Sequence, residues 1–308
     1  MSDVSIAPSP GGTFTLAGRA VARIGFGAGQ LPRLCNDPDA AVALVRRAVE
    51  LGVNHLDTAQ FYGDGFANEI LRAALRADDD VLVATKVGAE PNPGGPIPLR
   101  LAQRPEQLRA GVEANLRSLG VDRLDLVNLR RLDVGPGIRA TGDQVVDLDD
   151  QLATMVALRD EGLIGAIGLS AVSRESLVRA LPAGIVCVQN AYSLASRAYE
   201  GLLEVCLEHG LAWVPFYPLG GTFAMMPKVV EQPAVVRAAE RLGASPSEVG
   251  QAWLLAHAPN VLVISGTTSP AHLEQNLAVG SLALDSETIA ELDAVAEPGG
   301  VIPFLQRD

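Results

Sequence analysis

The 308-residue sequence predicts an α/β fold, a (β/α)8 TIM barrel preceded by a β-hairpin. Short segments rich in β-branched residues alternate with longer segments of helical periodicity, and this alternation repeats eight times. No change in composition divides the chain into halves. Repeated strand-then-helix units without a linker favour a barrel over a doubly wound sheet.

The predicted hairpin pairs residues 13–16 with residues 19–22 around Ala17-Gly18. Residues 1–12 have no basic segment followed by an apolar run, so we expect a flexible lead-in and one barrel domain over residues 13–308. The barrel strands are expected at 21–27, 53–59, 81–88, 124–130, 164–170, 185–191, 211–218 and 261–266.

Helices are expected between these strands, for example over 39–52, 104–120 and 150–163, where a glycine marks each helix end. The longest irregular stretches follow the third, fourth and seventh strands, at 88–101, 131–147 and 219–231. Because the loops after the strands of such a barrel carry its active site, we expect these three stretches at the catalytic mouth.

Composition excludes several classes of function. The formal net charge is −12, from 36 acidic and 24 basic residues, so a surface for nucleic acid is not expected. No apolar run is long enough to span a membrane. The three cysteines, Cys35, Cys187 and Cys206, lie too far apart for a zinc site or a redox pair, and we expect reduced packing residues in a cytoplasmic protein. No metal-ligand spacing is present.

The stretch "GVNHLDTAQFYG", residues 52–63, places Asp57 and Tyr62 just after the second strand. A buried carboxylate needs a cationic or hydrogen-bonding partner. Lys86 is the candidate, because alternation along the third strand points it into the barrel at the mouth. The chain has 22 arginines and only two lysines, which indicates that this position needs a compact amine.

Together these three residues suit carbonyl chemistry. A tyrosine hydroxyl is a weak acid in water, and an adjacent ammonium makes proton release easier. An aspartate would keep the lysine charged and oriented, so that Tyr62 can protonate a carbonyl oxygen while a hydride reaches the carbon. The alternative is a purely structural ion pair between Asp57 and Lys86.

On these motifs the chain resembles the aldo-keto reductase family, from "RIGFG" to "QNLAV" at 275–279. "GVNHLDTAQFYG" looks like the family's signature around its aspartate and tyrosine, and "VATKVG" looks like its lysine strand. The resemblance implies a TIM barrel, an NADP(H) cofactor and reversible reduction of a small carbonyl compound, with Asp57, Tyr62 and Lys86 as catalytic residues.

The resemblance also implies cofactor-binding positions. Ser170 and Gln189 match residues that hold the nicotinamide amide, and Ala171 stands where asparagine is usual. Phe216, in "VPFYPLGG", matches the ring that stacks on the nicotinamide. The remaining positions implied for the cofactor are Gly27, Ala28, Asp57, Leu219 and Gly220, with Gly266, Thr267, Thr268, His272, Gln275 and Asn276 for the adenosine half.

The segment 264–276 supports an anion site in its own right, because Ser269-Pro270 reads as a helix N-cap followed by a first-turn proline. This segment holds no lysine or arginine, so the preference for NADPH over NADH follows from the resemblance and not from charge. "GFGAGQ" (25–30) is similar to a Rossmann glycine turn, but Pro32 and "LCNDP" come before any helix, so we interpret it as the loop after the first strand.

The fourth strand departs from the family, because Arg130 falls where a catalytic histidine is usual. Arg130 either orients the substrate oxygen as a fourth catalytic residue or marks a cofactor-binding regulatory protein with little turnover. Retention of Asp57, Tyr62 and Lys86 favours the enzyme. His55 is expected to be a core residue and not a catalyst.

Substrate is indicated only by short segments. "DLVNLR" and "VPFYPLGG" look like bacterial reductases of pyridoxal, and the alternative is a general reductase of aldehydes or ketosugars. Arg131 and Arg139, in the loop after the fourth strand, either attract an anionic substrate or are simply solvated.

Overall fold

The computed structural model describes residues 9–95, 97, 99–221, 226–296, 299 and 301–304. Its core is an eight-stranded parallel sheet in the order β11-β10-β9-β8-β5-β4-β3-β12. The strands are β3 (Ile24–Gly27), β4 (His55–Asp57), β5 (Leu82–Val87), β8 (Leu124–Arg130), β9 (Ile164–Ser170), β10 (Ile185–Gln189), β11 (Ala212–Trp213) and β12 (Val263–Ser265).

The two edges of this sheet meet and close a barrel. Trp213, at the end of β11, forms a parallel bridge with Val261, just before β12. The Trp213 amide donates to the Asn260 carbonyl at 2.8 Å, and the Leu262 amide donates to the Trp213 carbonyl at 2.8 Å. The predicted (β/α)8 barrel is therefore confirmed. The closure joins β11 to the chain that enters β12, the two edges of the sheet order given above.

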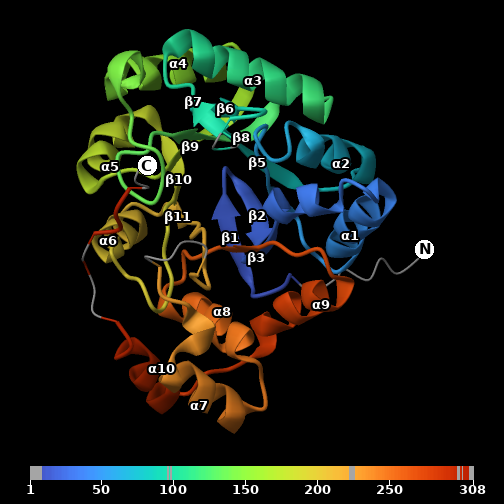
Figure 1. Ribbon diagram of the computed structural model, residues 1–308, viewed down its shortest axis with the longest axis vertical. Helices are drawn as coiled ribbons and strands as arrows, with labels where there is room; N and C mark the ends of the chain where they lie inside the picture. The colour runs from blue at the N-terminus through green and yellow to red at the C-terminus, as the bar shows by residue number, and fades with distance from the viewer. Residues whose placement is uncertain are drawn as a thin grey trace.

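Helices surround the sheet in chain order, as Figure 1 shows. They are α1 (Pro38–Glu50), α2 (Phe66–Ala74), α3 (Pro105–Leu119), α4 (Leu148–Asp160), α5 (Arg174–Ala180), α6 (Glu200–Glu208), α8 (Pro246–His257) and α9 (Pro270–Ala278). The predicted glycine stop is clearest at α3, where Gly120 adopts a left-handed conformation with φ of 69°. Side chains on the outer face of the sheet, such as Val127 and Leu129, pack into the buried layer beneath these helices.

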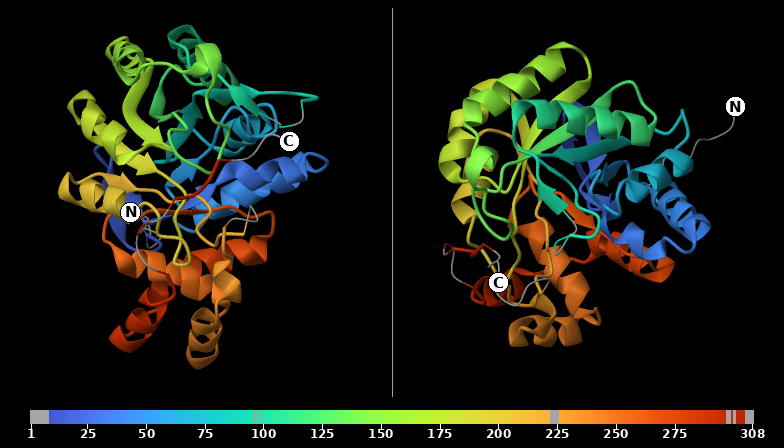
Figure 2. Two further views of the ribbon diagram at one scale, coloured as in Figure 1. Left: turned by 60° about the vertical axis from the view of Figure 1, so that its left-hand side comes forward. Right: turned by 45° about the horizontal axis from the view of Figure 1, so that its top comes forward.

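Two further helices, α7 (Pro233–Leu242) and α10 (Ser286–Asp293), lie outside the ring beside α8 and project from it together (Figure 2). Glu291 of α10 links them through ion pairs with Arg237 at 2.6 Å and Arg241 at 2.8 Å. These pairs are solvent-exposed, so they orient the two helices more than they stabilise the fold.

The predicted hairpin is confirmed as β1 (Thr13–Leu16) and β2 (Arg19–Ala22). Leu16 and Val21 are buried against Leu82 and other inward side chains near the start of the barrel strands, so the hairpin covers that end. The first barrel strand begins at Ile24 and not at residue 21, because Val21 and Ala22 already pair within the hairpin.

The lead-in before the hairpin is described only from residue 9. The Ile24 amide donates to the Pro10 carbonyl at 3.1 Å, and the Arg23 amide donates to the Gly12 carbonyl at 2.9 Å. Residues 9–12 therefore lie against the chain that enters β3. Residues 1–8 of the expected flexible segment lie outside the described residues.

Two sequence expectations need correction. The stretch 88–101, expected to be irregular, contains a short antiparallel pair, β6 (Ala89–Pro91) and β7 (Leu99–Leu101), because this loop is long enough to fold back and pair with itself.

Cys187 and Cys206 are buried as expected, but Cys35 is exposed, because it follows the 3-10 helix η1 (Ala28–Leu34) at the surface. All three are free thiols.

Within the described residues, no helix is long and apolar enough to cross a membrane. The same part of the chain contains no group of three histidine, cysteine or acidic side chains placed to hold a metal ion.

Candidate active site

The carboxyl ends of β4 and β5 bring Asp57 and Lys86 together inside the barrel mouth. Both side chains are almost fully buried, at 2% and 6% exposure. Lys86 Nζ donates to Asp57 Oδ1 and, at 3.0 Å, to the Thr58 carbonyl. Leu82 and Ala84 precede Lys86 on the same inner face of β5, which confirms the alternation predicted from the sequence.

Tyr62 reaches the same point from the turn after β4. Its amide donates to the Ala59 carbonyl at 3.0 Å, and Lys86 Nζ lies 5.1 Å from the centre of its ring. Gly63 follows in a left-handed conformation with φ of 66°, and a Cβ there would lie 2.9 Å from the ring of Pro32. Glycine after the tyrosine therefore permits the turn that directs Tyr62 towards Lys86.

The charges around Lys86 favour its ammonium form. Burial alone would lower the pKa of Lys86, but the Asp57 carboxylate and the Tyr62 hydroxyl oppose this, and the net effect raises the pKa. Lys86 therefore stays a cation beside the phenol ring of Tyr62.

His55 points into the layer below this pair. Its side chain is fully buried, and burial lowers its pKa to about 4. Smaller effects come from Asp57, which raises the pKa, and from Lys86, which lowers it. Neither ring nitrogen has a hydrogen-bond partner among the described residues. The prediction that His55 is a core residue is confirmed by its complete burial.

Arg130, at the end of β8, lies on the inner face together with Leu126 and Asn128 as predicted, and it reaches the mouth. Its guanidinium carbon lies 5.6 Å from the centre of the Phe61 ring. Burial lowers the pKa of Arg130, while the hydroxyls of Tyr62 and Tyr217 act in the opposite direction. The structure therefore brings all four predicted catalytic residues to one end of the barrel.

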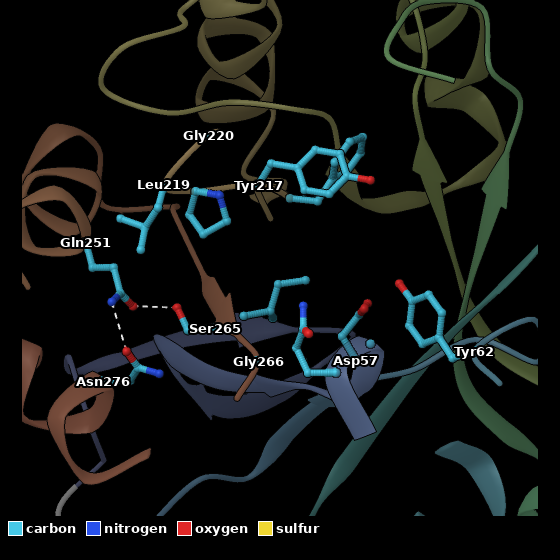
Figure 3. A pocket seen from close by; sticks show the side chains of 15 residues that line it. Asp57, Tyr62, Tyr217, Leu219, Gly220, Gln251, Ser265, Gly266 and Asn276 are labelled. Carbon is cyan, nitrogen blue, oxygen red and sulfur yellow. Dashed lines mark hydrogen bonds between the residues drawn. The ribbon is translucent and has the colours of Figure 1, made fainter. Parts of the chain in front are cut away.

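A cavity of about 270 Å³ extends from Tyr62 along the carboxyl ends of the strands (Figure 3). Tyr62 stands at one end, and the amide side chains of Gln251 and Asn276 stand at the other. Its lining residues are Gly27, Gly29, Gln30, Asp57, Tyr62, Phe216, Tyr217, Pro218, Leu219, Gly220, Gln251, Ile264, Ser265, Gly266 and Asn276.

Seven of the predicted cofactor positions line this cavity: Gly27, Asp57, Phe216, Leu219, Gly220, Gly266 and Asn276. Ala28 is buried in the core instead, and Ser170 is buried at the end of β9. Gln189 lies just beneath the cavity, where its Nε2 donates to Asp57 Oδ2 at 2.7 Å. Its Oε1 is buried without a partner among the described residues.

The other predicted positions lie in α9 or in the loop just before it. Ser269 caps this helix by accepting from the His272 amide at 3.4 Å, and Thr267 Oγ1 accepts from the Ser269 amide at 3.0 Å. The predicted N-cap is thus confirmed. Thr267, Thr268, His272 and Gln275 do not line the cavity, and both His272 and Gln275 are exposed.

Sequence reasoning missed several cavity residues: Gly29, Gln30, Tyr217, Pro218, Gln251, Ile264 and Ser265. Gln251 connects three elements, because it accepts from Ser265 Oγ and donates to Asn276 Oδ1 at 3.0 Å (Figure 3). For Tyr217 the sequence did indicate a place at the site, since it directly follows the predicted cofactor residue Phe216 in "VPFYPLGG".

The glycine-rich stretch 25–30 does not form a Rossmann turn. Residues Ala28–Leu34 form η1, and the first α-helix begins only at Pro38. Gly27 pairs with the neighbouring strand so closely that a Cβ would lie 2.6 Å from the Ile264 carbonyl oxygen. The interpretation as the loop after the first barrel strand is correct for residues 28–30 only, because residues 25–27 belong to β3 itself.

A closed parallel barrel that holds an aspartate, a lysine and a tyrosine at its mouth, beside an elongated cavity, defines a barrel oxidoreductase acting on carbonyl compounds. The chain belongs to the Aldo/keto reductase family, which it matches over residues 23–297.

Known relatives agree with this assignment. The chain is 39% identical to pyridoxine 4-dehydrogenase of Escherichia coli, over 92% of this chain and 98% of that protein. It is similar to an aldo-keto reductase from Klebsiella pneumoniae solved in complex with NADPH, with a TM-score of 0.77 and 26% identity, covering 93% of this chain and 95% of that one. A second Klebsiella pneumoniae structure, solved with NADP and acetate, gives a TM-score of 0.78 and 26% identity, covering 95% and 99%.

Proposed function

We propose that this protein reduces the aldehyde of pyridoxal to the alcohol of pyridoxine, with NADPH as the hydride donor. The observation that carries the reaction type is the buried contact of Lys86 with Asp57 beside Tyr62. The 39% identity to pyridoxine 4-dehydrogenase supports the substrate.

The described residues fit a nicotinamide cofactor. The cavity is elongated, as a dinucleotide requires, and it begins at Tyr62 and ends among the amides of Gln251 and Asn276. Gln189 Oε1 is a buried acceptor without a partner among the described residues, and the N–H of a carboxamide would satisfy it. Phe216 offers a flat face on the cavity wall.

When bound, this cofactor supplies the hydride that reaches the carbonyl carbon. The chain supplies the proton. Tyr62 donates from its hydroxyl to the carbonyl oxygen as negative charge develops there, and the Lys86 ammonium stabilises the phenolate that remains. Asp57 keeps Lys86 charged and fixes its position by accepting a hydrogen bond from Nζ on Oδ1.

A panel of carbonyl compounds tests the proposal. We expect the wild type to oxidise NADPH, followed by its absorbance, with a higher kcat/KM for pyridoxal than for simple aldehydes or ketosugars. A clear preference for another aldehyde would support the general reductase instead. Slow turnover of every compound would support a cofactor-binding regulatory protein.

The variant Tyr62→Phe separates chemistry from cofactor binding. Loss of the acid should reduce kcat by about 100-fold to 10,000-fold, while NADPH still quenches the fluorescence of the protein's tryptophans. Retention of most of the wild-type turnover would show that Tyr62 is not the proton donor.

A further inference from the structure

Arg130 carries a charge for which the described chain provides no counter-ion. Its Nη1 is buried without a hydrogen-bond partner, and its guanidinium forms no ion pair with a described carboxylate. The adjacent Arg131 differs, because it binds Asp133 at 3.1 Å and also donates to Gln151. A partly buried, unpaired cation is costly, so Arg130 is available to an anion from outside the chain.

The anion would lie beside the proton donor. The Arg130 guanidinium packs over the ring of Phe61, and the Phe61 and Tyr62 rings stand edge to face at 5.2 Å. Arg130 lies two residues beyond Asn128, which pairs with Lys86 across β8 and β5. A ligand whose carbonyl oxygen meets the Tyr62 hydroxyl therefore presents its neighbouring atoms to Arg130.

The surrounding side chains select a flat ligand. The Phe61 ring contacts the Arg130 guanidinium and the Tyr62 ring, and Phe216 and Tyr217, whose rings stand edge to face at 5.1 Å, line the cavity. Aromatic side chains pack well against a planar ring. A ring also holds two neighbouring substituents in one plane, so two oxygens on adjacent ring positions reach two donors together.

We propose that Arg130 selects aromatic aldehydes that carry an ionised hydroxyl on the ring carbon next to the aldehyde-bearing carbon. This inference rests on the proposed reductase function, and it deepens it by naming the substrate class. Pyridoxal belongs to that class. Arg130 forms a charge-assisted hydrogen bond with the ionised oxygen, while the Tyr62 hydroxyl binds the aldehyde oxygen.

The pairing also affects reactivity. An ionised oxygen beside an aldehyde donates electron density through the ring and makes the carbonyl carbon a poorer hydride acceptor. A guanidinium bound to that oxygen withdraws part of this density. By binding the ionised oxygen, Arg130 therefore offsets part of the loss of reactivity that this oxygen causes at the carbonyl carbon.

A matched pair of aldehydes tests the inference: 3-hydroxypyridine-4-carbaldehyde and pyridine-4-carbaldehyde, which differ only in the hydroxyl. We expect wild-type kcat/KM to be about 10 to 100 times higher for the hydroxylated compound, in line with one charge-assisted hydrogen bond. In Arg130→Met this ratio should fall by about tenfold or more, whereas Arg130→Lys should keep part of it because the charge remains.

Arg139→Met is the matched control, because Arg139 belongs to the loop after β8 but stacks on Phe304 at 4.5 Å. For Arg139→Met, the ratio of kcat/KM between the hydroxylated and the unsubstituted aldehyde should equal that of the wild type. If Arg130→Met lowered kcat/KM by the same factor for both aldehydes, the inference would be overturned. A wild type whose kcat/KM is not higher for the hydroxylated compound would overturn it as well.

Binding gives an independent measurement. Both aldehydes are titrated against the protein saturated with NADP+, which cannot reduce them, and we expect tighter binding of the hydroxylated compound. Equal dissociation constants would again overturn the role of Arg130. A clear binding preference without any NADPH oxidation would count against the reductase function alone.

Discussion

Gln189 donates from Nε2 to Asp57 Oδ2 at 2.7 Å across the inside of the barrel. The two residues end β10 and β4, which lie four strands apart in either direction around the closed sheet. Asp57 thus receives hydrogen bonds from Lys86 on one oxygen and from Gln189 on the other. Because Gln189 Oε1 has no partner among the described residues, the proposed contact with a cofactor carboxamide would leave the hydrogen bond to Asp57 intact.

We expect Gln189→Met to weaken NADPH binding by about tenfold and to lower kcat by a similar factor, because each lost hydrogen bond to a buried polar group costs about 1–3 kcal/mol. Fluorescence titration measures the first effect and steady-state kinetics the second. Gln189→Glu should be worse in kcat, since it places a second carboxylate against Asp57. Unchanged affinity and kcat in Gln189→Met would show that the contact serves neither role.

Lys86→Arg should lose at least about 100-fold in kcat, because a broad guanidinium cannot occupy the buried space between Asp57, the Thr58 carbonyl and Tyr62. NADPH should still bind within about tenfold of the wild-type affinity. The other lysine provides the control: Lys228→Arg changes an exposed partner of Glu231 and should leave kcat unchanged. Wild-type kinetics for Lys86→Arg would reduce Lys86 to a structural ion pair.

The inner face of the barrel was predictable because a strand turns successive side chains to opposite sides. That rule, applied to β5 and β8, correctly directs Lys86 and Arg130 inward without any knowledge of the helices. The positions of Asp57 and Tyr62 followed from the same strand ends, since parallel strands in a barrel all finish at one mouth.

The far end of the cavity was not predictable in this way. Gln251 lies on α8, and a glutamine on an amphipathic helix gives no sign of function until the packing of that helix over β12 is known. Nearer to Tyr62, the sequence did indicate Tyr217 through its neighbour Phe216, but not its left-handed conformation with φ of 57°, which is unusual for a tyrosine. Tertiary contacts determine both positions.

Ala171→Asn should improve the cofactor site and the fold together. Ala171 follows β9 in a left-handed conformation with φ of 53°, which asparagine tolerates better than alanine. An asparagine there would also supply the amide that the family resemblance places beside the nicotinamide. We expect a higher melting temperature and a dissociation constant for NADPH lowered by about threefold to tenfold.

Ala17→Asn is the control for this variant, because Ala17 has φ of 50° in the β1-β2 turn, far from the cavity. It should raise the melting temperature without changing NADPH binding. Equal NADPH affinity in Ala171→Asn and the wild type would show that the missing amide contact is made by another residue.

His55 should make the fold sensitive to acid. Its pKa falls from 6.5 to about 4 on folding, chiefly because of burial, so between these values the unfolded chain binds more protons than the folded chain. The stability due to neutral His55 is therefore complete above pH 6.5 and is lost as the pH falls towards 4, a loss of about 3 kcal/mol at most.

His55→Leu should remove this part of the pH dependence, since leucine suits the apolar layer beside Leu82. His209→Leu, which replaces an exposed histidine, should keep it. Denaturant unfolding of the three proteins in steps from pH 8 to pH 4 measures the difference, and parallel curves for the wild type and His55→Leu would contradict the assignment.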